Sequence, residues 1–302
     1  MVVISNVNNK YIAAKETVYG TTPGTFTSVD FGHIQKITIS EEENMEKVAS
    51  VNSGHLYALF EDGLYWANVS IDTLVSKASL PILLEACMGK KVETTDYTIT
   101  TDPTNDDSYS IKVTYSTADI ALINGFGIKD WEITAAKGDK VALTMNGIAR
   151  KVSNVTEVIA PTTNTDELFK DLDASVTIGG NSFVLNSFSI SSNWNVTDDE
   201  GRGIESVSAG DRRLITTIIR HRLDVSGSYE AEVSDSAEFG YTEERSDEAI
   251  IFTLNRGTDN EHTFTMTKTR SVSRSMDSTI ENSKKVISYD YEAIDVGAVG
   301  DL

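Results

Sequence analysis

The feature that most constrains the fold is a pair of long segments, 183–196 and 223–233, in which apolar residues recur at every second position. A period of two is the pattern of a β-strand that buries one face. The apolar positions are Val184, Phe188, Ile190, Trp194 and Val196 in the first segment, and Leu223, Val225, Tyr229, Ala231 and Val233 in the second. We therefore predict one very long β-hairpin.

The connection between these segments, residues 197–213, is long, polar and charged. Hairpin loops are usually two to five residues long. A connection of this length either lacks order or is held by a neighbouring molecule, and we expect the neighbour.

The charge balance limits the classes of partner. The chain carries 46 acidic and 26 basic residues, for a net charge of −20. Binding to nucleic acid or to an anionic membrane needs a basic surface, so neither is expected. No apolar run approaches the roughly 20 residues that cross a bilayer. Residues 1–10 lack the pattern of a signal peptide, so we expect synthesis and folding in a reducing cytoplasm.

The order of patterns along the chain predicts two domains. Residues 1–30 are rich in turn formers and are predicted to be an arm. A first domain covers 31–157, a linker covers 158–170, and a second domain covers 171–302 with a short tail after Asp295. One helix is predicted after residue 78, with Ser79 as N-cap, Pro81 in the first turn and Gly89 at the C-terminus.

The remaining strands are predicted from the same alternation. In the first half a strand at 34–40 leads through an acidic connection, 41–54, to a strand at 64–75. Further strands are predicted at 109–116, 127–135, 140–145, 249–254, 263–269 and 286–293, with a tight turn at 137–139 and a second helix at 236–244.

The two halves share short signals that suggest a tandem duplication. Thr38-Ile-Ser40 and Ser189-Ile-Ser191 enter the two long connections and are separated by about half of the chain. Similar serine-containing segments, 50–54 and 206–210, leave the connections at nearly the same separation. Chance similarity between serine-rich loops is the alternative.

Residues that could support catalysis or metal binding do not form a recognisable motif. His33, His55, His221 and His262 are widely spaced, so we predict no metal site and no cofactor. Cys87 falls on the apolar stripe of the predicted helix and is expected to pack in the core. The acidic stretch 102–107 could in principle bind a cation, but a solvated loop is the preferred interpretation.

Long strand edges and long loops instead favour assembly. Bare edges aggregate unless they are paired or covered. A closed ring of copies would pair these edges and give the loops and the arm a surface to dock on. Carboxylates around a central hole would repel DNA over about 8 Å at physiological salt.

Four parts of the chain match one known family: residues 14–23, residues 31–38, the strand–helix unit that ends at 83–89, and the hairpin from 183 to 232. In these parts the chain resembles the tail tube (major tail) proteins of long-tailed bacterial and archaeal viruses. The resemblance implies a mainly β fold of tandem β-sandwich or partial-barrel tube domains, each with a flanking α-helix and a long hairpin loop. It also implies a virion protein that forms stacked rings, through which the genome passes without specific binding.

The resemblance also implies roles for two groups of residues. The ring-stacking loops would contain Glu41, Glu42, Glu43, Glu46, Asp198, Asp199, Glu200, Arg202, Glu205, Asp211, Arg212 and Arg213. The inter-subunit arm would contain Tyr11, Tyr19, Pro23 and Phe26. The partners would be further copies, as a trimer with pseudo-six-fold symmetry or a hexamer, together with tape measure and tail-end proteins, and no membrane.

Two other functions remain as alternatives. A two-domain β-sandwich on a virion or cell surface could recognise carbohydrate or protein. A hydrolase with paired carboxylates would need two acids fixed in a cleft with separated pKa values. Because the clusters 41–43 and 198–200 are predicted at loop tips, an enzyme is not expected.

Overall fold

The structure is a computed structural model, and it describes most of the 302 residues. The described residues are 2–4, 10–26, 29–43, 46–49, 57–61, 64–93, 96–102, 104, 107–114, 119–157, 159, 166–170, 173–178, 180–196, 204–205, 213–215, 220, 222–233, 248–256, 261–278 and 285–301.

The fold is mainly β, as predicted. The first-half strands are β1 Val2–Ile4, β2 Tyr11–Lys15, β3 His33–Glu43, β4 Glu46–Ala49, β5 Tyr57–Glu61, β6 Leu64–Leu74, β7 Gly89–Glu93, β8 Asp96–Thr101, β9 Tyr109–Thr114, β10 Ile120–Ala136, β11 Ala142–Ala149 and β12 Lys151–Val155. The second-half strands are β13 Ala174–Ile178, β14 Asn181–Asn193, β15 Ile204–Glu205, β16 Arg213–Ile215, β17 Asp224–Val233, β18 Glu248–Asn255, β19 Glu261–Ser278, β20 Lys285–Ala293 and β21 Asp295–Asp301. Within the described residues the only helix is α1, Ser79–Met88.

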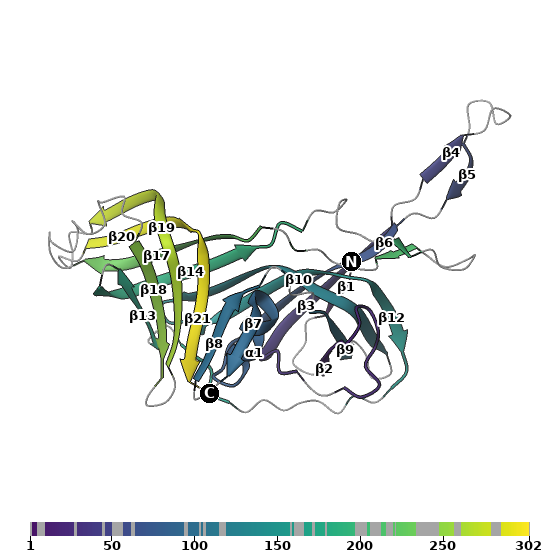
Figure 1. The fold of residues 1–302 in the computed structure, drawn as a ribbon, viewed down its shortest axis with the longest axis horizontal. Helices are drawn as coiled ribbons and strands as arrows, with labels where there is room; N and C mark the ends of the chain where they lie inside the picture. The colour runs from purple at the N-terminus through teal and green to yellow at the C-terminus, as the bar shows by residue number, and fades with distance from the viewer. Residues whose placement is uncertain are drawn as a thin grey trace.

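The predicted long hairpin is present as β14 and β17. The two strands pair antiparallel from Val184 opposite Glu232 to Asn193 opposite Asp224. They belong to one antiparallel sheet that runs β1–β3–β6–β11–β10–β14–β17–β20–β19 through both halves of the chain (Figure 1). We call this the long sheet.

The long sheet repeats one strand order twice. The first half contributes β3–β6–β11–β10 and the second contributes β14–β17–β20–β19. In each half, the first and second strands in the sequence are neighbours in the sheet, and the fourth strand in the sequence lies between the second and the third.

The irregularities of the ladders repeat as well. A β-bulge between Ile34 and Lys36 in β3 corresponds to one between Leu185 and Ser187 in β14. The shift along the chain that relates these two bulges is the same as the shift that carries Thr38 onto Ser189. A second bulge, in β10 after Ile128, corresponds to one in β19 after Ser271. Bulges at matching ladder positions are specific local features, so the two halves have the same design.

The two repeats meet side by side in the long sheet. Strand β10 pairs with β14 from Asp130 opposite Asn193 to Ala136 opposite Ser187. At the centre of this joint Ile133 lies opposite Ile190, and both side chains are fully buried. We call this ladder the internal joint.

Six strands of the second half close into a barrel. The ladder runs β13–β14–β17–β20–β19–β18 and back to β13. Aromatic rings fill its interior: Phe252 stacks on Phe188 at 5.0 Å, and Tyr229 stacks on Tyr289 at 5.1 Å between ring centroids. A large aromatic core of this kind supplies much of the apolar area that the fold buries.

The helix α1 covers the apolar side of the first half (Figure 1). Leu80, Leu83, Leu84 and Cys87 are fully buried, as their spacing predicts. Gly89 is the C-cap, with φ 118°. The N-cap prediction is wrong by one residue, because Ala78 holds that position; the Ser79 hydroxyl instead accepts the Ser76 N–H at 3.0 Å.

Two stretches differ from the sequence-based expectation, and a third lies outside the described residues. Residues 41–43 extend β3 and residue 46 opens β4, so the described part of the first acidic connection is strand. Residues after Asp295 form β21, which pairs with β19 and with β8, so the short tail is a strand that joins the halves. The second predicted helix, 236–244, lies outside the described residues.

The proposed linker is docked on the first half where the structure describes it. Phe169 is 1% exposed, and its N–H donates to the Val75 carbonyl at 3.0 Å. The Phe169 carbonyl accepts the Val141 N–H at 3.0 Å. The exact domain boundaries stay a prediction, since the long sheet passes across them.

Candidate functional site

One side of the long sheet is polar across both repeats. The buried positions of each strand, such as Ile37, Ile71 and Met145, belong to the hydrophobic core, which also contains the apolar side chains of α1. Most of the alternating positions are half-buried or exposed and carry hydroxyl, amide or carboxylate groups; Trp66, Leu74, Ala142 and the buried Ile148 are apolar positions on the same side. We call these positions the polar face: Thr38, Ser40, Glu42, Asn68, Ser70, Asp72, Asp130, Glu132, Thr134, Thr144, Asn146, Ser187, Ser189, Ser191, Ser226, Ser228, Glu230, Ser288, Asp290 and Glu292.

Neighbouring strands tie these groups together. Across β6 and β11, Thr144 Oγ1 donates to Asp72 Oδ1 at 3.0 Å. Across β10 and β11, Asn146 Nδ2 donates to Asp130 Oδ1 at 2.6 Å. Direct cross-strand partners of this kind stabilise a sheet and fix its register.

The second repeat uses serine for the same purpose. The hydroxyls of Ser189 and Ser228 lie 3.0 Å apart, and those of Ser191 and Ser226 lie 2.9 Å apart. Ser288 Oγ donates to Glu230 Oε1 at 3.3 Å. These serine hydroxyls hydrogen-bond to one another across the strands, so short side chains are sufficient to pair the polar groups of this surface.

The polar face is acidic. Its carboxylates are Glu42, Asp72, Asp130, Glu132, Glu230, Asp290 and Glu292. The basic residues in the same rows of the described ladder are Lys36, opposite Asp72, and Arg270, opposite Glu292. The surface can therefore repel a polyanion at short range while its hydroxyl groups hydrogen-bond water.

The two outer edges of the long sheet differ. At one edge β1 pairs with β3 over Val2–Ile4. At the other, residues 270–278 of β19 pair with β20 on one side, and the described part of the chain provides no ladder on the other. An open edge of this length is a ready template for another strand.

The first predicted stacking loop projects from the body. Strands β4 and β5 form a separate two-stranded sheet, with Lys47 opposite Phe60, and Figure 1 shows this hairpin extending beyond the rest of the chain. Glu46 lies in β4. Glu41 and Glu42 lie in β3, where their carboxylates accept hydrogen bonds from Tyr65 Oη and Asn68 Nδ2, each at 2.7 Å.

The second predicted stacking loop is described in part. Glu205 lies in β15 and Arg213 in β16, which pair with each other. Strand β16 also pairs in parallel with the start of β6, through Arg213 opposite Leu64. The other predicted members lie outside the described residues: Asp198, Asp199, Glu200, Arg202, Asp211 and Arg212.

The predicted arm is fixed to its own chain over much of its length. Strand β2 pairs with β9, from Tyr11 opposite Val113 to Lys15 opposite Tyr109. The Tyr11 hydroxyl donates to the Gly32 carbonyl, and burial raises the pKa of this phenol. Phe26 lies under Lys112 Nζ at 4.1 Å, and Pro23 is half-buried. Contact between these residues and another subunit stays a prediction.

A buried carboxylate, which the sequence analysis did not single out, organises the arm. Glu16 is 7% exposed. Its Oε2 accepts the Gly20 N–H and the Ser108 hydroxyl, both at 2.6 Å. Its Oε1 accepts the Ser110 hydroxyl at 2.5 Å and the Gly125 N–H at 2.9 Å. No sequence signal separates Glu16 from a surface acid, because three of its four donors come from distant segments of the chain.

The residues considered for chemistry have structural surroundings. Cys87 is fully buried, and burial raises the pKa of its thiol, so it is not a poised nucleophile. His262 is 1% exposed, and its Nδ1 lies 2.6 Å from the Tyr97 hydroxyl. Asp102 Oδ1 accepts both the N–H and the hydroxyl of Thr104. Among the described residues no three acidic, histidine or cysteine side chains are grouped as metal ligands.

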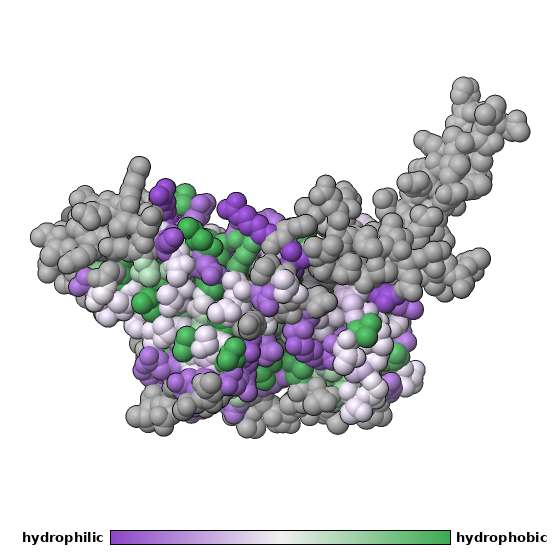
Figure 2. All heavy atoms as spheres, in the orientation of Figure 1, coloured by the Kyte–Doolittle hydropathy of each residue, from purple (hydrophilic) through white to green (hydrophobic). Residues whose placement is uncertain are grey.

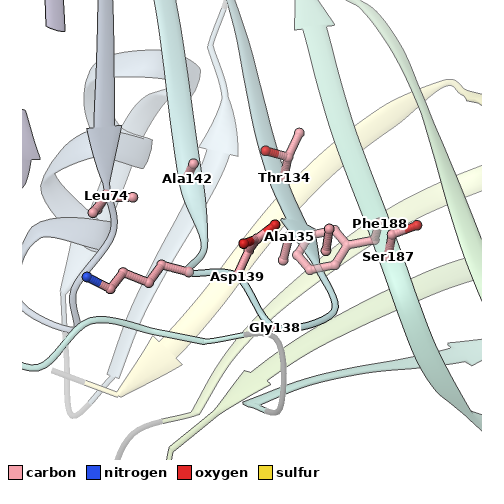
Figure 3. Close-up of a pocket in the computed structure, with 10 residues that line it drawn as sticks. Leu74, Thr134, Ala135, Gly138, Asp139, Ala142, Ser187 and Phe188 are labelled. Atoms are coloured by element: carbon pink, nitrogen blue, oxygen red, sulfur yellow. The ribbon is translucent and has the colours of Figure 1, made fainter. Parts of the chain in front are cut away.

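A groove of about 640 Å³ lies where the β10–β11 turn approaches β14 (Figure 3). It is lined by Leu74, Thr134, Ala135, Ala136, Gly138, Asp139, Lys140, Ala142, Ser187 and Phe188. Asp139 is its one carboxylate, so the groove does not hold the two fixed acids that a glycosidase needs. On the face seen in Figure 2, apolar and hydrophilic residues are interspersed rather than separated into large areas.

The comparisons with known proteins agree with this architecture. The family model described as phage tail tube protein matches residues 8–294, which include every strand from β2 to β20. No curated protein matches the chain. Among the described residues no helix is long and apolar enough to cross a membrane.

The match favours a structural role over the binding-module alternative, since it names the tube itself and extends through both repeats. The mainly β fold with its closed barrel is the architecture that the resemblance implied. The chain belongs to the phage tail tube protein family, and it is a structural component of the virion tail.

Proposed function

We propose that three copies of this chain close into one ring of six repeats, and that these rings stack to form the tube. The internal joint carries the proposal. It shows two repeats joined edge to edge through seven residue pairs, from Asp130–Asn193 to Ala136–Ser187. A rotation that places one repeat beside the next can be applied again, and such head-to-tail contacts give a closed ring when the rotation closes.

In this ring the polar face lines the channel. The opposite face of the long sheet is already covered by α1 and the inner layer, so the uncovered side is the one available to the lumen. Its hydroxyl groups and carboxylates hold water and repel phosphates, and its basic residues lie in rows that also contain an acid. DNA passes such a surface without being bound.

Stacking between rings uses the projecting β4–β5 hairpin and the loop 197–213. The hairpin extends beyond the body as its own two-stranded sheet (Figure 1), which supports a role in contacting a neighbouring ring. Of the charged residues predicted for stacking, Glu46, Glu205 and Arg213 lie in these two segments, whereas Glu41, Glu42 and Glu43 lie at the end of β3. The N-terminal arm, residues 1–30 with Tyr11, Tyr19, Pro23 and Phe26, completes the contact between subunits.

The other partners follow from the role in the tail. Tape measure and tail-end proteins contact the tube, and the chain binds no membrane and catalyses no reaction. It is made in the cytoplasm of the host and becomes part of the virion on assembly.

One experiment tests the ring and its channel together. Purified protein is assembled, and native mass spectrometry of single rings is expected to show three chains rather than six. The double variant Asp290→Lys and Glu292→Lys is expected to assemble but to slow DNA ejection. The matched control is Glu93→Lys, at an exposed position on β7 outside the long sheet. Rings of six chains would contradict the ring proposal, and unchanged ejection would contradict the position of the polar face.

A further inference from the structure

The N-terminal strand occupies a position that has a counterpart in the second repeat. Strand β1 pairs antiparallel with β3 at Ile37, Thr38 and Ile39. The shift that superposes the bulge of β3 on the bulge of β14 carries these three positions onto 188–190. Residues 188–190 are the part of β14 that pairs with β10 at the centre of the internal joint. On the first repeat, β1 therefore takes the place that a neighbouring repeat takes on the second.

The two pairings have the same direction and use corresponding positions of β3 and β14. Val2 lies opposite Ile39, as Ile133 lies opposite Ile190. Both ladders are antiparallel, so β1 runs along β3 in the sense in which β10 runs along β14. The agreement is a matter of backbone pairing and does not depend on similarity between the side chains.

The strand that corresponds to β10 in the second repeat is β19. The shift that superposes their two bulges carries Asp130 onto Ser273 and Ile133 onto Met276. If β19 of a second copy pairs with β3 as β10 pairs with β14, then Met276 of that copy lies opposite Ile39, and its Asp277 lies opposite Thr38. These are backbone groups that β1 uses in the free chain.

One edge of a strand accepts one ladder, so β1 and the second copy's β19 exclude each other there. The ladder of β1 has three residue pairs. The internal joint, which is the template for the contact with β19, has seven. The longer ladder satisfies more backbone groups, so the exchange favours assembly once a second copy is present.

We infer that β1 covers the β3 edge of the free subunit and is displaced by β19 of a second copy when the ring closes. This inference rests on the proposed ring. Its consequence is that, among the described residues, 270–278 of β19 form the longer edge without a second ladder, whereas the β3 edge is covered at Ile37–Ile39, so chains join head to tail and do not associate through two β3 edges.

A disulfide between β1 and β3 tests the displacement. The variant pairs Val3→Cys with Thr38→Cys, two positions that lie directly opposite each other. Opposed positions on antiparallel strands have Cβ separations of about 4.5–5.5 Å, close enough for a disulfide after small shifts. The native thiol, Cys87, is fully buried and does not compete.

The oxidised variant is expected to remain monomeric, and addition of reductant is expected to restore tubes. Tubes formed by fully oxidised protein would overturn the inference while leaving the proposed function intact. Failure of the wild-type chain and of the reduced variant to form rings would overturn the proposed function, and the inference with it.

A second pair of cysteines tests the contact that replaces β1. Thr38→Cys with Asp277→Cys is expected to give covalent dimers and trimers on a denaturing gel after assembly, but none from dilute monomer. The control joins Thr38→Cys with Ser273→Cys, four positions out of the inferred register, and is expected to cross-link at least tenfold less. Equal cross-linking in the two variants would show that β19 does not meet β3 in this register.

Discussion

Replacement of Glu16 by glutamine tests whether a single buried carboxylate fixes the N-terminal segment to the body. The side chain keeps its shape but loses its charge and one of its two acceptor oxygens. In the wild type the two oxygens accept four hydrogen bonds, two from backbone N–H groups and two from serine hydroxyls. The variant therefore changes hydrogen bonding without leaving a cavity.

The expected loss follows from the bonds that glutamine cannot make. Its single oxygen retains two of the four donors, and its amide group points N–H groups at the other two. Hydrogen bonds to a charged group contribute about 1.5–3 kcal/mol each. Relief of the desolvation cost of a buried charge offsets part of the loss. We expect the free energy of unfolding to fall by about 3 kcal/mol, a large part of the roughly 5–15 kcal/mol of a typical domain.

Urea unfolding of dilute, unassembled protein, followed by tryptophan fluorescence, measures the change. The control is Glu167→Gln, which removes an exposed carboxylate paired with Arg256 at 3.2 Å. An exposed pair contributes about 0–1 kcal/mol, so the control midpoint should move little. A third variant, Ser110→Ala, removes one donor from Glu16 Oε1 and should cost about 1 kcal/mol.

The reasoning fails if Glu16→Gln unfolds within about 0.5 kcal/mol of the wild type, or if Glu16→Gln and the exposed control lose the same amount. Either result would mean that the four contacts do not hold the arm in solution. An additive loss in Glu16→Gln and Ser110→Ala combined would also contradict it, since residues that share one hydrogen-bond network are expected to be non-additive.

Three further perturbations have definite expected outcomes. Gly227→Ala would place a Cβ 2.2 Å from the Ser189 carbonyl oxygen and should separate β14 from β17, costing about 3 kcal/mol or more by urea unfolding; Gly24→Ala, with nothing within 4 Å, should change stability by less than about 0.5 kcal/mol. Phe252→Ala empties the centre of the barrel and should cost about 3–5 kcal/mol, with a loss below about 1 kcal/mol showing that the aromatic stack is not tightly packed. Burial raises the folded-state pKa of the Cys87 thiol, so its contribution to the free energy of unfolding is complete below the unfolded pKa of about 8.5 and declines above it, by up to about 1.4 kcal/mol per pH unit. Cys87→Ala should therefore reduce the fall of the unfolding free energy between about pH 8.5 and 10, and an unchanged slope would contradict the burial of this thiol.

The sequence predicts the long strands well because their alternation is sustained. Val225, Tyr229 and Ala231 are each buried, as the period of two requires. The helix is also predicted correctly, since its apolar stripe and Gly89 are local signals that no distant contact has to supply. Both cases rest on information held within a short stretch of neighbouring residues.

Other elements depend on distant partners and could not be read from the chain. Strand β21 contains Gly297 and Gly300, which lower strand propensity, and it exists because β19 and β8 flank it. Glu16 resembles a surface acid until the fold brings its donors together. The order of the polar face likewise appears only when strands from both halves lie side by side.

The tandem repeat is clearer in the structure than in the sequence, for a specific reason. At matching places in the two repeats a glycine stands opposite a larger residue, but the roles are exchanged between strands. In the first repeat Gly147 of β11 lies opposite Val69, whereas in the second Gly227 of β17 lies opposite Tyr291 of β20. In both repeats one small and one larger residue share the same space, but they come from opposite strands. The aligned residues therefore differ, and a sequence comparison finds little similarity.

The internal joint also has a consequence for the kinetics of tube growth. In a ring of three chains, three of the six seams are made during folding, at a rate independent of protein concentration. The other three seams form between molecules, and two encounters suffice because the last seam closes within the trimer, so nucleation is a lower-order process than it would be for six separate repeats. The peptide link holds the partner strands at an effective concentration in about the millimolar range, which lets half of the seams of each proposed ring form before any two molecules have met.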